Sequence, residues 1–143
     1  MTHLVTRMGR GILACILGGV LTGALAGPLA ADPAAGTWKT AEGEDGGYLL
    51  VTIAPCGAKL CGTIAKAYDA TGGVSGSYAH LGKPILWDMV AEGGGAYGGG
   101  KIWAPDTGKT YASKMALSGN VLKVKGCVAG GMICRGQDWA RVK

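Results

Sequence analysis

Apolar and polar residues alternate in short segments over most of the chain, and Gly, Pro, Asn or Asp separates these segments. Residues 48–54 are an example, because Leu49, Val51 and Ile53 fall on one face. A period of two is the pattern of a half-buried β-strand, and the helical period is nearly absent after residue 31. The alternation predicts eight strands, over residues 36–42, 48–54, 59–66, 84–90, 101–104, 109–117, 121–127 and 134–142.

The connections between these segments are mostly of hairpin length. Eight short strands without helical crossovers indicate an all-β fold, an antiparallel barrel or sandwich. A small up-and-down barrel either holds one small ligand or is filled by its own side chains. Residues 93–100 are expected to form a Gly-rich turn. Residues 67–83 form the longest irregular connection, and loops of that length often serve as lids or binding loops.

The N-terminal segment has the order of a secretory signal peptide. Arg7 and Arg10 precede residues 11–31, which carry no charge and end in small residues. We expect residues 1–31 to be this signal, with cleavage after Ala26 or Ala31, and residues 32–143 to be one domain. Two alternatives remain. The segment approaches the roughly 20 residues of a membrane anchor, and Cys15 lies in a sequence similar to a lipid-attachment site.

Charge places limits on the partners. The formal net charge is +5, and it falls to +3 when Arg7 and Arg10 leave with the leader. The basic residues are scattered and form no dense run with interleaved aromatics, so nucleic-acid binding is not expected. The G-x-G-x-x-G pattern at residues 93–98 lacks a following helix, so no dinucleotide cofactor is expected. The mature protein is expected in the periplasm or secreted, without stable membrane insertion.

Four cysteines remain after the leader, and in an oxidising compartment an even number indicates disulfides. Four cysteines allow three connectivities. The local pairs, Cys56–Cys61 and Cys127–Cys134, would each close a loop of hairpin size. The alternatives are a zinc site of four thiolates, whose spacings would be unusually wide, and free thiols. We expect disulfides and no metal.

Catalytic arrangements find little support. His80 is the one histidine after the leader, and it lies near Ser75 and Ser77 without a nucleophile-elbow motif. Most carboxylates fall in turn-like segments, where Asp favours local hydrogen bonds. We therefore expect a protein that is not an enzyme, with an envelope hydrolase as a remote alternative.

Aromatic residues are the candidate ligand contacts. Those expected in loops or at the mouth of a barrel are better binding candidates than those expected in the core. The alternative is that strand aromatics fill the core and loop aromatics decorate the rim. The candidates are Tyr68, Tyr78, Tyr97, Trp103 and Tyr111.

Several motifs resemble the bacterial exported family DUF2147. They are Gly36-Thr37-Trp38, Pro55-Cys56-Gly57 with Leu60-Cys61-Gly62, Leu81-Gly82-Lys83-Pro84, residues 100–111 and Leu122-Lys123-Val124-Lys125-Gly126-Cys127. The resemblance covers essentially all of residues 32–143. It implies a lipocalin-like β-barrel exported to the periplasm or beyond, and it implies an architecture rather than an activity.

The segment Gly36-Thr37-Trp38 also resembles the G-x-W opening of lipocalins, in which a Trp closes one end of the barrel and a basic residue covers it. Arg141 is the expected counterpart, since a guanidinium can stack on an indole and bond to backbone carbonyls. Together these features favour a disulfide-stapled lipocalin-like protein that binds a small hydrophobic or amphipathic molecule in the cell envelope. The alternative is a structural or interaction module whose barrel is filled by side chains.

Overall fold

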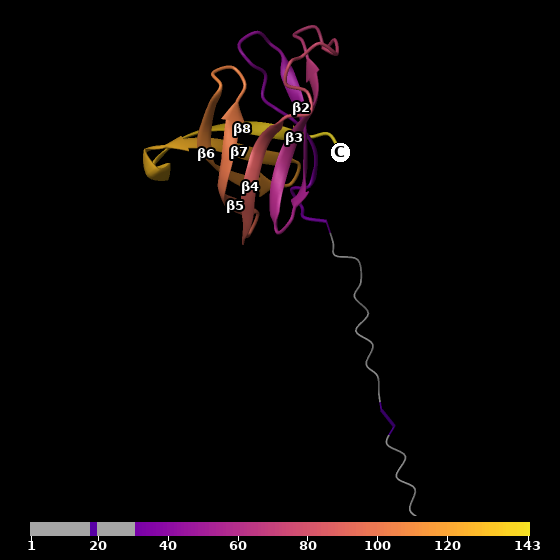
Figure 1. Cartoon of the computed structure of the whole chain (residues 1–143), viewed down its shortest axis with the longest axis vertical. Helices are drawn as coiled ribbons and strands as arrows, with labels where there is room; N and C mark the ends of the chain where they lie inside the picture. The colour runs from indigo at the N-terminus through magenta and orange to yellow at the C-terminus, as the bar shows by residue number, and fades with distance from the viewer. Residues whose placement is uncertain (1–17, 20–30) are drawn as a thin grey trace, which may run out of the picture.

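The computed structural model describes residues 18–19 and 31–143, and it is an all-β protein built as one closed barrel (Figure 1). The strands are β1 (Gly36–Lys39), β2 (Tyr48–Cys56), β3 (Lys59–Tyr68), β4 (Pro84–Gly93), β5 (Ala96–Ala104), β6 (Lys109–Ser118), β7 (Val121–Val128) and β8 (Ile133–Arg141). A short 3-10 turn, η1 (Ala129–Gly131), joins the last two. The expected signal peptide lies almost wholly outside the described residues. Among those residues, no helix is long and apolar enough to cross a membrane.

Each strand pairs antiparallel with the next, and β1 closes the barrel by pairing with both β2 and β8. Trp38 illustrates the closure, because it lies opposite Val51 on one side and Arg141 on the other. The up-and-down order gives the barrel two different ends. We call one the closed end; it carries the segment Asp32–Ala35 and the turns after β2, β4 and β6. The loop end carries the longer connections at residues 40–47, 69–83, 105–108 and 129–132.

The eight predicted strands are all present, and the predicted barrel is confirmed. The expected turn at residues 93–100 is wrong, because β5 already begins at Ala96. Its glycines serve packing. A Cβ at Gly100 would overlap the Met89 sulfur, so glycine there makes room for a core side chain. Gly99 has φ +70°, a conformation that favours glycine, and lies where the register between β5 and β6 shifts.

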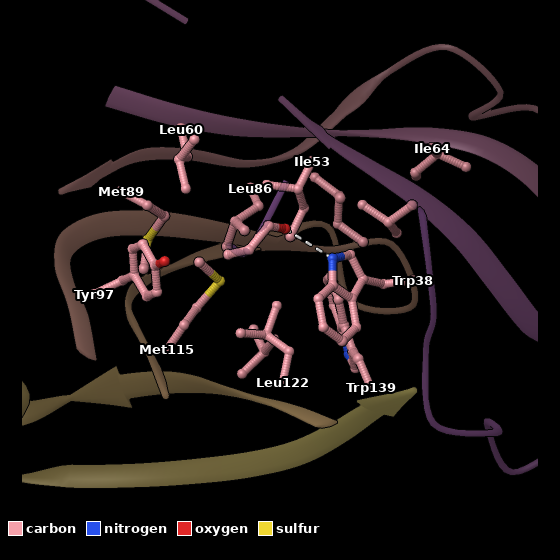
Figure 2. Close-up of a cluster of buried hydrophobic side chains, with 14 residues drawn as sticks. Trp38, Ile53, Leu60, Ile64, Leu86, Met89, Tyr97, Met115, Leu122 and Trp139 are labelled. Atoms are coloured by element: carbon pink, nitrogen blue, oxygen red, sulfur yellow. Dashed lines mark hydrogen bonds between the residues drawn. The ribbon is translucent and has the colours of Figure 1, made fainter. Parts of the chain in front are cut away.

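Large apolar side chains form the core inside the barrel (Figure 2). Trp38, Trp139, Leu86 and Met89 are all at most 1% exposed. In β2, β3 and β6, alternate residues contribute over part of each strand, as the alternation predicts. The remaining large members of the cluster are Val51, Ile53, Leu60, Ile64, Ile85, Tyr97, Met115, Leu122 and Val124.

Both local disulfides are present. Cys56–Cys61 ties the end of β2 to the start of β3 across their turn. Cys127–Cys134 joins directly opposed residues of β7 and β8, with Cα atoms 4.1 Å apart. All four sulfurs are engaged, so the alternatives of a four-thiolate zinc site and of free thiols are wrong.

Candidate functional site

The closed end is covered by the segment Asp32–Ala35 and by Arg141. The Trp38 indole nitrogen donates to the Ala34 carbonyl at 2.9 Å inside the barrel (Figure 2). The Arg141 guanidinium lies 4.3 Å from the centre of the Trp38 ring. Its two terminal nitrogens donate to the carbonyls of Ala35 and Pro33. This is the contact expected from the lipocalin resemblance, and it seals this end of the barrel.

Tyr97 belongs to the same seal. It was expected in a loop as a ligand contact, but it lies in β5 and is only 4% exposed. Its hydroxyl donates to Asp32 Oδ1 at 2.6 Å, and the same oxygen accepts the Ala34 N–H. Burial, reinforced by the Asp32 carboxylate, raises the pKa of Tyr97 to about 12. The buried phenol therefore stays neutral, and its hydrogen bond to Asp32 holds the segment Asp32–Ala35 over the closed end.

The candidate binding site is a groove of about 520 Å³ on the outer wall of the barrel. Its lining residues alternate with core residues. Trp87 follows the buried Leu86, and Thr63 lies between the buried Gly62 and Ile64, so both face outward. We call this hollow the wall groove; it is lined by Cys56, Cys61, Thr63, Lys83, Pro84, Trp87 and Trp103.

The wall groove is mostly apolar. Trp87 and Trp103 offer partly exposed indole surface, and the Cys56–Cys61 disulfide and Pro84 add compact apolar walls. Lys83 and Thr63 supply polar groups among these walls. A concave apolar surface with few polar groups is the usual form of a small-molecule site. The arrangement suits a ring or short alkyl chain attached to an anionic or hydrogen-bonding group.

The long loop contributes aromatic neighbours to this site. His80 contacts Trp103 edge to face, with ring centroids 4.8 Å apart, and contacts Tyr78 in the same manner at 5.3 Å. Lys83 Nζ lies 3.3 Å from His80 Nδ1. Burial, with the charge of Asp106 as a second cause, raises the pKa of Tyr78. The structure thus brings two of the predicted aromatics, Tyr78 and Trp103, to one region.

The other predicted aromatics lie elsewhere. Tyr68 is the last residue of β3 rather than a loop residue, and it stacks on Tyr48 with centroids 4.8 Å apart. It lines a second outer hollow of about 360 Å³, over β1, β2 and β3. Tyr111 shares the inward face of β6 with Ser113 and Met115 and is half-buried. The five aromatics therefore form no single site.

Both outer hollows have walls of outward-facing residues. Neither opens into the interior, which the core cluster occupies in the described part of the chain. Sequence reasoning missed most of the wall groove, namely Trp87, Pro84, Lys83 and Thr63. The usable signal was the position of Trp87 directly after an inward residue of an alternating strand. Its neighbours come from β2, β3 and β5, and only the register brings them together.

Among the described residues, His80 has no serine hydroxyl as a hydrogen-bond partner. The side-chain contacts of His80 are to Lys83, Tyr78 and Trp103 rather than to a serine hydroxyl. The Asp69 carboxylate bonds within its own loop, to Thr71 and Gly73. These hydrogen bonds lower the pKa of Asp69. Within residues 18–19 and 31–143, no group of three His, Cys, Asp or Glu side chains is placed to hold a metal ion.

Comparison with known proteins supports the architecture. A solved structure described as "Protein HP1028 from the human pathogen Helicobacter pylori belongs to the lipocalin family" is similar to this chain, with a TM-score of 0.56 and 21% sequence identity. The similarity covers 76% of this chain and 82% of that chain, and at such identity it shows the fold alone. No curated protein matches the chain. The model of the family described as "Uncharacterized protein conserved in bacteria (DUF2147)" matches residues 36–141, from β1 to β8. The chain is a lipocalin-like barrel and belongs to the DUF2147 family.

Proposed function

We propose that this protein is an exported, lipocalin-like binding protein that holds the apolar part of a small hydrophobic or amphipathic molecule in the wall groove. The observation that carries this proposal is the placement of two indoles, a proline and a disulfide around one hollow of about 520 Å³. Exposed aromatic surface gathered in a concavity is costly to leave in water and is a common feature of ligand sites. Lys83 is suited to meet an anionic group of the same molecule.

The outer wall is favoured over the lumen because of packing. Lipocalin-like barrels of eight strands leave room for a ligand only when their inward side chains are small or few. Here Trp38, Trp139 and Met89 are fully buried in the lumen, together with many branched side chains. A ligand in the lumen would have to displace this core, at a cost that the wall groove does not impose.

The cell envelope is the proposed location. Disulfides persist in oxidising compartments, and this fold contains two. Residues 1–31 have the order of an export signal. Either predicted cleavage, after Ala26 or after Ala31, leaves the cap segment Asp32–Ala35 intact, so export is compatible with the closed barrel. Binding rather than catalysis is proposed because the groove is lined mainly by side chains without acid–base chemistry.

The test uses 8-anilinonaphthalene-1-sulfonate, whose aromatic rings suit the indoles and whose sulfonate suits Lys83. Its fluorescence is titrated against the protein beginning at Asp32. We expect saturable one-to-one binding, weakened about tenfold by Trp87→Ala and less by Lys83→Met, because stacking and apolar burial supply most of the affinity.

Tyr111→Ala is the matched control, because Tyr111 faces the lumen. It should leave the affinity unchanged. Loss of binding in Tyr111→Ala with full binding in Trp87→Ala would contradict the proposal and indicate that the ligand binds in the lumen.

The second candidate function is an interaction module whose filled barrel presents the same groove to an apolar side chain of a partner protein. The filled core favours it, and wild-type protein that binds no small probe would support it.

A further inference from the structure

The turn between β7 and β8 carries Met132, the most exposed large apolar side chain of the described residues, between two further exposed apolar side chains. Met132 is 88% exposed, Ile133 61% and Val128 47%. We call residues 128–133 the hairpin tip. Figure 1 shows this segment, in gold, projecting to one side and away from the other loops. Three apolar side chains gathered at one projecting turn are unlike single exposed residues scattered over a surface.

The hairpin tip is held rather than loose. The Cys127–Cys134 disulfide closes its base, and Val128 pairs with Ile133 directly above it. The Met132 N–H donates to the Ala129 carbonyl at 3.4 Å, which completes the turn. Val128 and Ile133 lie beyond the disulfide, whereas the core residues of these two strands, Leu122, Val124 and Trp139, lie on its other side.

A basic collar surrounds the base of the hairpin tip. Lys114 and Lys125 are directly opposed on β6 and β7, and Arg135 follows the disulfide on β8. The Lys114 ammonium reaches the tip itself, since it lies 3.8 Å from the place of a Cβ on Gly131. The chain has no acid between Asp106 and Asp138, so β6, β7 and the turns that follow them supply no carboxylate to offset these charges. Directly opposed like charges are unfavourable without an anionic partner.

We propose that the hairpin tip docks reversibly on an anionic lipid surface. Val128, Met132 and Ile133 would enter the headgroup boundary while Lys114, Lys125 and Arg135 meet lipid phosphates. Apolar insertion and electrostatic attraction together are what surface binding requires, since either alone is weak. A lipid surface suits this tip better than a protein does, because a stable protein interface buries about 800 Å² on each partner and favours aromatic anchors. The hairpin tip offers three aliphatic or thioether side chains.

The experiment is co-sedimentation with vesicles. The protein beginning at Asp32 is used, because residues 11–31 are apolar and would bind lipid themselves, whereas the closed barrel with its cap lies wholly within residues 32–143. Vesicles of phosphatidylcholine alone are compared with vesicles that also contain phosphatidylglycerol. We expect binding to the anionic vesicles at least about tenfold tighter than to the neutral ones, and largely lost at high salt.

Variants separate the contribution of apolar insertion from that of electrostatic attraction. Met132→Ser with Ile133→Ser should weaken binding by about tenfold or more, because the inserted apolar area is removed. Lys114→Gln should weaken binding several-fold and reduce its salt dependence. Val121→Ser is the matched control, because Val121 is 44% exposed on β7, the strand that also carries Val128, but lies at the closed end; this change should leave vesicle binding unaltered.

Thermal melting of each variant establishes that the barrel is folded; should the double variant melt early, Met132→Ser alone takes its place. Wild-type protein that ignores anionic vesicles would overturn the proposal and leave the hairpin tip as a contact for a protein. Binding that persists unchanged without Met132 and Ile133, or that is equal on neutral vesicles, would overturn it as well.

Discussion

The four tryptophans divide the molecule into two regions. Trp38 and Trp139 lie inside the barrel, at most 1% exposed, whereas Trp87 and Trp103 are only partly buried and line the wall groove. The indole nitrogens of the inner pair each donate a hydrogen bond, to the Ala34 carbonyl and to Gln137 Oε1. The protein itself therefore covers the inner pair and accepts the hydrogen bonds of both indole nitrogens, whereas part of each outer indole stays exposed to solvent. The inner pair stabilises the fold, and the proposed binding rests on the outer pair.

The closed end and the hairpin tip repeat this contrast. At the closed end, the segment Asp32–Ala35 and Arg141 cover Trp38 with hydrogen bonds and stacking. At the hairpin tip, a disulfide holds Met132 and Ile133 outward, and no described segment covers them. Apolar surface that the chain covers contributes to folding. Apolar surface that a rigid element keeps exposed indicates binding.

Replacing an inner and an outer tryptophan is the strongest way to break the comparison. Trp38→Ala should lower the free energy of unfolding by about 3–5 kcal/mol, because it opens a large cavity and frees the cap segment. Trp87→Ala should lower it less, by about 1–2 kcal/mol, because its side chain is only partly buried and its loss leaves no closed cavity. Urea unfolding followed by circular dichroism measures both. Equal losses would show that the two regions do not differ.

Removing the two disulfides one at a time sharpens the comparison. Each disulfide closes a short loop, so the loss of either one should lower the free energy of unfolding by about 2 kcal/mol. The two double variants are Cys56→Ser with Cys61→Ser, and Cys127→Ser with Cys134→Ser. Only the first pair should also weaken binding of the aromatic sulfonate probe, because only that disulfide lines the wall groove. The prediction fails if probe affinity falls equally in both variants.

A smaller change in stability is expected at alkaline pH, where the hydrogen bond between Tyr97 and Asp32 at the closed end is tested. The pKa of Tyr97 is raised from its ordinary 10.0 to about 12. The folded protein therefore keeps a proton that the unfolded chain releases, and this contribution to stability is full below pH 10 and lost as pH rises toward 12. Wild-type protein should lose stability more steeply over this range than Tyr97→Phe, as measured by urea unfolding at several pH values. Parallel curves would place Tyr97 in an ordinary solvated environment.

The sequence predicted the fold well because the physical signal for strands is local. Leu49, Val51 and Ile53 alternate with polar residues, and the barrel uses that face as its core. The prediction failed between residues 96 and 100, where glycine replaces the side chains that would carry the pattern. Tyr97 was assigned to a loop for the same reason. Glycine in that strand makes room for Met89, a reason that only packing reveals.

The candidate site was less accessible to sequence reasoning. Trp103 was among the predicted contacts, and Cys56 and Cys61 were predicted only as a structural staple. Trp87 and Lys83 join them through the pairing of β2, β3, β4 and β5, and pairing register is not written in any one segment. Periodicity indicates which face a residue takes. It does not indicate which outward residues become neighbours.

The most direct test of the central claim is a map of backbone amide shifts during titration with the aromatic sulfonate. Nitrogen-15-labelled protein beginning at Asp32 is titrated, and the amides that move are assigned. Binding in the wall groove predicts the largest shifts at Cys61, Thr63, Trp87 and Trp103. Shifts concentrated instead at inward-facing positions, namely Leu49, Ile102, Tyr111 and Gly126, would contradict the account and show that the lumen opens to take the ligand.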